Sequence, residues 1–148
     1  MIKVKGSNYN FDQSILKSLA CRGINYSFVT LHVGAGTFLP VTRDQLLRRK
    51  LHKEYGTISK RVAAEVNKTK RNGNQVVAVG TTTLRLIESA VSSKGIVREF
   101  NDYTQLMIGP EYSFKVCDRL LTNFHLPKSS LLMLVSSFSN TGKCFFSS

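Results

Sequence analysis

Histidine, threonine, asparagine and glycine residues gather in three short stretches, and each stretch directly follows an apolar run. The stretches are residues 32–37 ("HVGAGT"), 80–85 ("GTTTLR") and 122–129 ("TNFHLPKS"). Such residues can transfer protons, donate hydrogen bonds or let the backbone approach a ligand closely. In α/β proteins, ligands bind beyond the carboxyl ends of the strands. We therefore expect the three stretches to converge on one site.

The first stretch combines a histidine with two glycines and a threonine. Gly34 and Gly36 permit close approach of a ligand to the backbone, and Thr37 adds a hydroxyl. No Gly-Lys-Ser/Thr follows, so this is not a Walker loop, and the third glycine of a dinucleotide-binding loop is missing. On these residues alone, a structural turn and a ligand-binding loop both remain open.

The second stretch places three hydroxyls at a junction between a strand and a helix. Thr81, Thr82 and Thr83 follow Gly80, and Arg85 lies two positions further on. Hydroxyls and unpaired amides at a helix start suit a phosphate, a carboxylate or a ribose hydroxyl. The alternative is that one of the threonines simply caps the helix.

The third stretch offers an amide, an imidazole and a cation within a few residues. Asn123 can donate hydrogen bonds, and His125 can act as a general acid or base near neutral pH. Lys128 lies just before the expected helix. A histidine whose hydrogen bonds are satisfied within a turn is the alternative interpretation of His125.

The chain of 148 residues carries a net charge of +12, which favours polyanionic partners such as nucleic acid. Ten of the cations lie between residues 43 and 71, where there are only three acids. A solvated helix face is the alternative, although the cations are denser than that requires. The cations that we expect to contact RNA are Arg48, Arg49, Lys50, Lys53, Lys60 and Lys128.

The pattern of apolar residues predicts an α/β fold with a mostly parallel sheet, either open or partly closed like a barrel, flanked by helices. Residues 139–148 lack periodicity and are expected to form an irregular tail. Thr42, Ser59 and either Ser129 or Ser130 are expected to cap helices. The expected helices cover residues 11–23, 43–50, 59–73, 81–91 and 129–138, and the expected strands cover residues 27–33, 51–58, 75–80, 104–108 and part of 112–124.

The cysteines and the apolar runs argue against two classes of protein. The three cysteines are scattered and form no CxxC pair, so we expect reduced thiols, no metal site and a cytoplasmic location. The longest apolar run, residues 131–135, is too short to cross a membrane.

Four segments together resemble one enzyme family. "VTLHVGAGTFLPV", "LHKEY", "VAVGTTTLRLIESA" and "LLTNFHLPKSSLLMLVSSF" are similar, in this order, to the S-adenosylmethionine:tRNA ribosyltransferase-isomerases of queuosine synthesis. The resemblance implies transfer and isomerisation of the ribosyl part of S-adenosylmethionine onto 7-aminomethyl-7-deazaguanine at the tRNA wobble position. Epoxyqueuosine is the implied product, and tRNA is the implied partner of a monomeric protein.

The chemistry of that reaction can be matched to candidate residues. A proton-transfer group could be His32, His125 or the pair His52 and Glu54. The residues expected around S-adenosylmethionine are Gly34, Gly36, Thr37, Thr81, Thr82, Thr83, Arg85 and Asn123.

The chain also departs from the family pattern. Leu39, Lys53 and Glu111 stand where the family usually has glutamine, serine and glycine. The family enzymes are more than twice as long, so we expect residues 1–148 to form one incomplete α/β domain, without the family's N-terminal part and inserted β-barrel. A separately encoded N-terminal half could complete it. Two other functions stay open: an inactive remnant that binds RNA through charge, and a small-ligand module that uses the threonine stretch.

Overall fold

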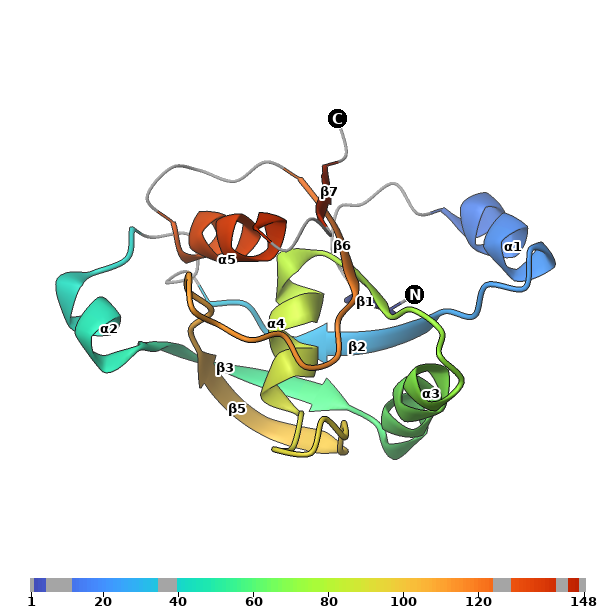
Figure 1. Cartoon of the computed structure of the whole chain (residues 1–148), viewed down its shortest axis with the longest axis horizontal. Coiled ribbons are helices and arrows are strands. Elements are labelled where there is room, and N and C mark those ends of the chain that lie inside the picture. The colour runs from blue at the N-terminus through green and yellow to red at the C-terminus, as the bar shows by residue number, and fades with distance from the viewer. Residues whose placement is uncertain (1, 5–11, 35–39, 124–128, 141–143, 147–148) are drawn as a thin grey trace.

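The computed structural model describes residues 2–4, 12–34, 40–123, 129–140 and 144–146, and its strands join in one seven-stranded sheet (Figure 1). The order across the sheet is β5-β3-β2-β1-β4-β6-β7. The elements are β1 (Ile2–Val4), α1 (Gln13–Cys21), β2 (Ser27–Leu31), α2 (Arg43–Arg48), β3 (Lys50–Ile58), α3 (Lys60–Arg71), β4 (Val77–Val79), α4 (Thr81–Ser89), β5 (Phe100–Leu106), β6 (Arg119–Thr122), α5 (Ser130–Ser139) and β7 (Cys144–Phe146).

The predicted α/β class is confirmed, but the sheet is mixed. Strands β2, β1, β4, β6 and β7 pair in parallel, whereas β3 pairs antiparallel with both β2 and β5. The link from β2 to β3 contains the six-residue helix α2, and after it the chain turns back so that β3 runs against β2.

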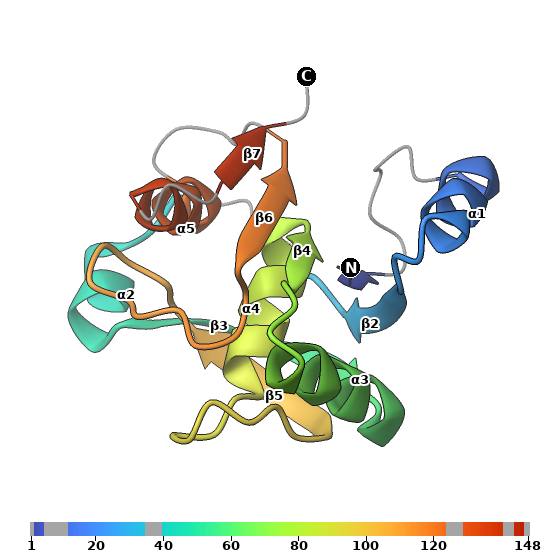
Figure 2. The same ribbon diagram turned by 45° about the vertical axis from the view of Figure 1, so that its right-hand side comes forward.

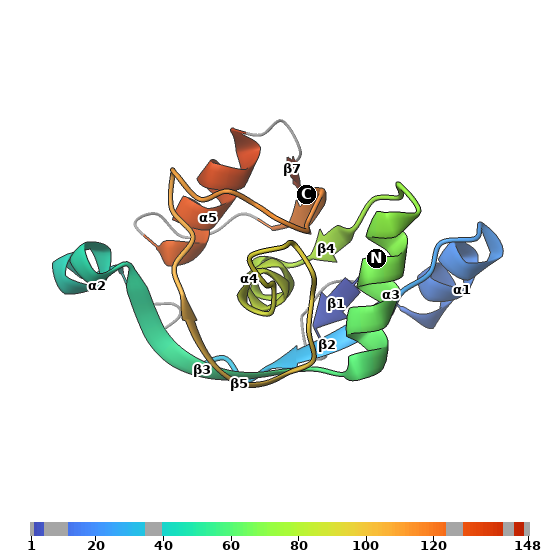
Figure 3. The ribbon, with the colours of Figure 1, turned by 60° about the horizontal axis from the view of Figure 1, so that its bottom comes forward.

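Helix α4 lies in the hollow of the curved sheet, where Figure 3 shows it end-on with the strands around it. Its Leu84, Leu86 and Ile87 are fully buried. Phe138 of α5 is also fully buried and belongs to the same core. The core therefore fills the inner face of the sheet and fixes α4 close to the ends of the strands.

The helix starts follow the sequence. Thr42 forms a capping box with Gln45, Ser59 accepts from the Val62 amide, and Ser129 accepts from the Leu132 amide. These bonds satisfy amide donors that a helix start leaves unpaired. The predicted caps are thus confirmed, with Ser129 rather than Ser130 at α5.

Three features differ from the expectations. Strand β1 was not foreseen, and residues 139–148, expected to be an irregular tail, begin with the last residue of α5 and contain β7. The sequence places Ile15, Leu16 and Leu19 on one face of α1, where burial is expected, but no residue of this helix is buried. Short strands such as β1 and β7 carry too few residues to show a periodicity.

Candidate active site

The three stretches begin where β2, β4 and β6 end, and parts of the first and third lie outside the described residues. They follow β2, β4 and β6, which share one direction in the sheet, and Figure 2 shows the arrows of β4 and β6 pointing the same way. The Gly80 amide donates to the Leu121 carbonyl at 2.8 Å, which joins the second stretch to β6. An isolated bridge between Pro40 and Ser129 joins the segment after the first stretch to the cap of α5.

A buried carboxylate connects the first stretch to the second. Glu54 of β3 is 3% exposed and forms an ion pair with Arg85 of α4, which is also 3% exposed. Its Oε1 accepts from the Gly34 amide at 3.3 Å. Glu54 therefore holds the backbone at the end of β2 and the guanidinium of α4 at the same time.

Arg85 retains hydrogen-bonding capacity. Among the described residues, its buried Nε has no hydrogen-bond partner. Burial lowers the pKa of Arg85 to about 10, so the guanidinium still carries its charge at neutral pH. Because this Nε atom is buried, a ligand would reach it only where neighbouring side chains move apart.

The threonines divide into different environments. Thr83 is fully buried and its hydroxyl donates to the Val79 carbonyl at 2.7 Å, which is a structural role. Thr81 is buried and Thr82 is half-buried. The helix cap is Gly80, at a φ of 94° and without a side-chain bond, so none of the threonines caps α4. A helix start carries amide donors that can bind an oxygen of a ligand.

His32 and His52 do not join this group. His32 is exposed, and its ring lies 6.0 Å from that of Tyr55. His52 is exposed whereas Glu54 is buried, so the two do not form the predicted pair. Asn123 is exposed at the end of β6. Gly36, Thr37, His125 and Lys128 lie outside the described residues.

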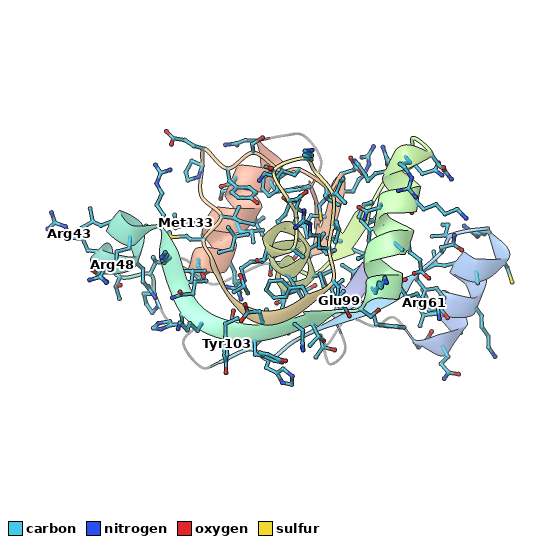
Figure 4. The ribbon with its side chains drawn as sticks, turned by 90° about the horizontal axis from the view of Figure 1, so that it is seen from below. Arg43, Arg48, Arg61, Glu99, Tyr103 and Met133 are labelled. Carbon is cyan, nitrogen blue, oxygen red and sulfur yellow. The ribbon has the colours of Figure 1, made fainter. Side chains whose placement is uncertain are left out.

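The cations between residues 43 and 71 are divided between two ends of the molecule. Helices α2 and α3 lie at opposite ends of the molecule in Figure 1, and Figure 4 labels Arg43 of α2 and Arg61 of α3 at these two ends. We call the carboxyl ends of β2, β4 and β6 the strand tips. Because β3 runs against β2, the first residue of β3 lies on the side of the strand tips and its last residue lies on the other side. Arg48, Arg49, Lys50 and Lys53 therefore lie on the side of the tips, and the exposed Lys60 begins α3 on the far side.

Comparison with known proteins adds the decisive observation. A family model described as "Queuosine biosynthesis protein" matches residues 5–146. The chain belongs to this family. The resemblance seen in the sequence is thereby confirmed, and with it the assignment to queuosine biosynthesis.

Relatives and a solved structure agree with the family. The S-adenosylmethionine:tRNA ribosyltransferase-isomerase of Acidiphilium cryptum is 54% identical over 130 residues, covering 88% of this chain and 38% of its own. The Caulobacter vibrioides enzyme of the same name is 49% identical over 132 residues, which cover 89% of this chain and 36% of that enzyme. The crystal structure of the Thermotoga maritima S-adenosylmethionine tRNA ribosyltransferase matches with a TM-score of 0.68 and 33% identity, covering 89% of this chain and 41% of that one. The chain thus spans about two-fifths of the length of these relatives.

A second buried carboxylate, Glu88, was not predicted from the sequence. Glu88 of α4 is 4% exposed. Its oxygens accept from the Val116 and Cys117 amides at 3.0 and 3.1 Å, and from the Lys115 amide at 3.0 Å. An acid four positions after the inward-facing Leu84 was the available signal, because such positions share a helix face.

The charge of Glu88 adds to the effect of burial on two neighbours. Burial, and next the carboxylate of Glu88, raise the pKa of Tyr112. The same two causes, in the same order, raise the pKa of the Cys117 thiol. Glu88 is thus a clamp that holds the loop before β6 against α4.

No group of three His, Cys, Asp or Glu side chains among the described residues could hold a metal ion. No helix in the described part of this queuosine biosynthesis chain is long and apolar enough to cross a membrane.

Proposed function

We propose that this chain carries the strand-tip part of the active site of an S-adenosylmethionine:tRNA ribosyltransferase-isomerase. The reaction moves the ribosyl part of S-adenosylmethionine onto 7-aminomethyl-7-deazaguanine at the tRNA wobble position, releases adenine and methionine, and yields epoxyqueuosine. The proposal rests on family membership and on the names of the relatives. The observation that carries it is Glu54, which ties Gly34 and Arg85 together at the tips.

The proposed roles follow from the environment of each group. The amides at the start of α4, with the hydroxyls of Thr81 and Thr82, would hold polar oxygens of S-adenosylmethionine. Arg85 would support the site through its ion pair with Glu54, since its own Nε is buried. Gly34 and, in our sequence-based assignment, Gly36, Thr37 and Asn123 would border the same ligand.

Glu54 receives a positioning role rather than the role of a base. A carboxylate that is neutralised by a guanidinium accepts a proton less readily than a free one. His32 packs on Tyr55, and His52 is exposed on β3. We therefore assign proton transfer to His125, on the strength of its place in the third stretch of the sequence.

The expected polyanionic partner is tRNA, which the exposed cations beside the tips would contact in the cytoplasm. Arg48 and Arg49 pair with Asp44 and Glu111 at 2.8 and 3.2 Å. All four side chains are largely exposed, so these pairs are weak and can yield to phosphates.

Adenine release from S-adenosylmethionine in the presence of undermodified tRNA tests the proposal. It should be measured with this chain alone and with the unmatched part of the Acidiphilium cryptum relative added as a separate polypeptide. Glu54→Gln should lower the rate about 100-fold, because a misplaced binding group costs that much. The exposed Glu99→Gln is the matched control and should keep the full rate.

One result would contradict the proposal: no adenine release in either setting from protein that is folded. A second candidate function would then account for the charge of +12, namely binding of RNA without chemistry. Such binding should fall steeply with salt and should ignore the identity of the RNA.

A further inference from the structure

The outer face of the antiparallel part of the sheet carries a row of aromatic side chains. His32 follows β2, Tyr55 lies in β3 and Tyr103 lies in β5. The centroids of the His32 and Tyr55 rings are 6.0 Å apart, and those of Tyr55 and Tyr103 are 5.4 Å apart. We call these three side chains the aromatic row.

The strand register explains why the row forms on this face. Tyr55 pairs directly with Tyr103, and the Tyr55 carbonyl accepts from the His32 amide at 2.9 Å. Successive residues of a strand point to opposite faces. Glu54 and Thr104, the neighbours of these tyrosines, are buried on the inner face with α4. Figure 4 shows Tyr103 on the side of the sheet away from α4.

The row is accessible and held in place. Tyr103 is 60% exposed, and the Tyr55 hydroxyl donates to the Asn101 Oδ1 at 2.5 Å. The rings of Tyr55 and Tyr103 meet edge to face at 66°. One of the two rings contacts the other through its edge, so its faces are not covered by this contact. Faces of this kind are stacking surfaces for unpaired bases.

The groups around the aromatic row suit a nucleic acid, which carries phosphates and has bases with hydrogen-bonding edges. On this face, Thr57 pairs with Asn101, which brings a hydroxyl and an amide beside the rings. Lys53, two residues before Tyr55, is exposed, and β3 continues from it toward the cations at its start. Together with the net charge of +12, these groups favour RNA.

We propose that the aromatic row is a stacking platform for unpaired bases of a single-stranded RNA segment, with the cations at the start of β3 contacting its phosphates. The idea rests on the proposed function in so far as tRNA supplies the RNA. It goes further by naming the surface and the form of RNA that this surface accepts. A duplex, whose bases are already stacked, gains little from such a platform.

Direct binding by the full chain tests the platform without any catalysis. The probes are a labelled single-stranded oligouridylate of about ten nucleotides and an RNA duplex of equal length. Tyr103→Ala should weaken single-strand binding about 5- to 150-fold, the range for the loss of one stacked base. Tyr103→Phe should retain binding, because it keeps the ring.

Ile96→Ala is the control, since this side chain is 50% exposed and lies outside the strands of the sheet. It should bind both probes as the unchanged chain does. Circular dichroism of each variant should be unaltered, because Tyr103 is largely exposed and its loss leaves the core intact.

Three outcomes would overturn the platform. In the first, Tyr103→Ala binds the single strand normally. In the second, Tyr103→Phe loses as much as Tyr103→Ala, so the hydroxyl and not the ring matters. In the third, Tyr103→Ala loses association with the unmatched part of the Acidiphilium cryptum relative while RNA binding stays normal, which would make the face a protein interface. A different result would contradict the proposed function and leave the platform standing. In that result, no adenine is released, but the chain binds the single strand and Tyr103→Ala weakens this binding.

Discussion

Glu54 and Arg85 are two charges removed from water together, and each depends on the other. Removing one partner of a buried ion pair leaves an uncompensated charge, which costs about 3–5 kcal/mol. Removing both leaves no such charge. The pair therefore fixes β3 and α4 relative to each other. Burying either charge without the other would cost the free energy of an uncompensated charge.

This dependence gives a prediction for a double-mutant cycle. Arg85→Met should lower the free energy of unfolding by about 3–5 kcal/mol, because Glu54 then stays buried without the guanidinium of Arg85. Adding Glu54→Gln should recover a large part of that loss. Urea unfolding of the two single variants and the double variant measures the coupling. Losses that simply add would show that the two charges do not stabilise each other.

At the scale of elements, α4 organises the chain from both ends. Its start leaves β4 through Gly80, whose φ of 94° is a conformation that other residues rarely adopt. Further along, Glu88 holds the loop before β6 through backbone amides. The helix thus presents its first turn to the proposed substrate while its last turn anchors the approach to β6.

The clamp gives a prediction at the same scale. Glu88→Gln replaces one acceptor oxygen by a donor group that faces amide donors, so the free energy of unfolding should fall by about 2–4 kcal/mol. The exposed Glu99→Gln is the matched control and should change it by less than about 0.5 kcal/mol. Equal stability of the two variants in urea would show that the amides of the loop are satisfied in another way.

Elements with strong local signals were predictable from the sequence. Helices α2, α3 and α5 begin where their caps predicted, because capping depends on residues three positions apart. The direction of β3 was not predictable, since it depends on pairing with β2 and β5. The ion pair of Glu54 with Arg85 and the aromatic row were hidden for the same reason, as their members come from different elements.

At the scale of the whole molecule, the fold separates cations that are close in the sequence. The segment from residue 43 to residue 71 suggested one continuous contact surface for RNA. The structure instead distributes it between α2 with the start of β3, beside the strand tips, and α3 at the other end. We expect the cations near the tips to face the RNA.

Salt dependence of RNA binding can separate the two ends. The slope of log K against log salt should fall by about 0.7–0.9 for each phosphate contact removed. Lys53→Gln should show this change, whereas Lys68→Gln on α3 should leave the slope unaltered. Fluorescence anisotropy at several salt concentrations measures both. Equal changes in the two variants would mean that the RNA reaches both ends.

Strand β1 has three residues, yet it lies between β2 and β4 and joins the strand groups on its two sides. It pairs with β4 at Ile2 and Lys3, whereas β3 and β5 pair at six positions, so fewer ladder hydrogen bonds hold this seam. The sheet should therefore open first along this seam. In native-state hydrogen exchange, amides bonded across β1 would exchange before those between β3 and β5, and the molecule would come apart as two separately protected sub-units.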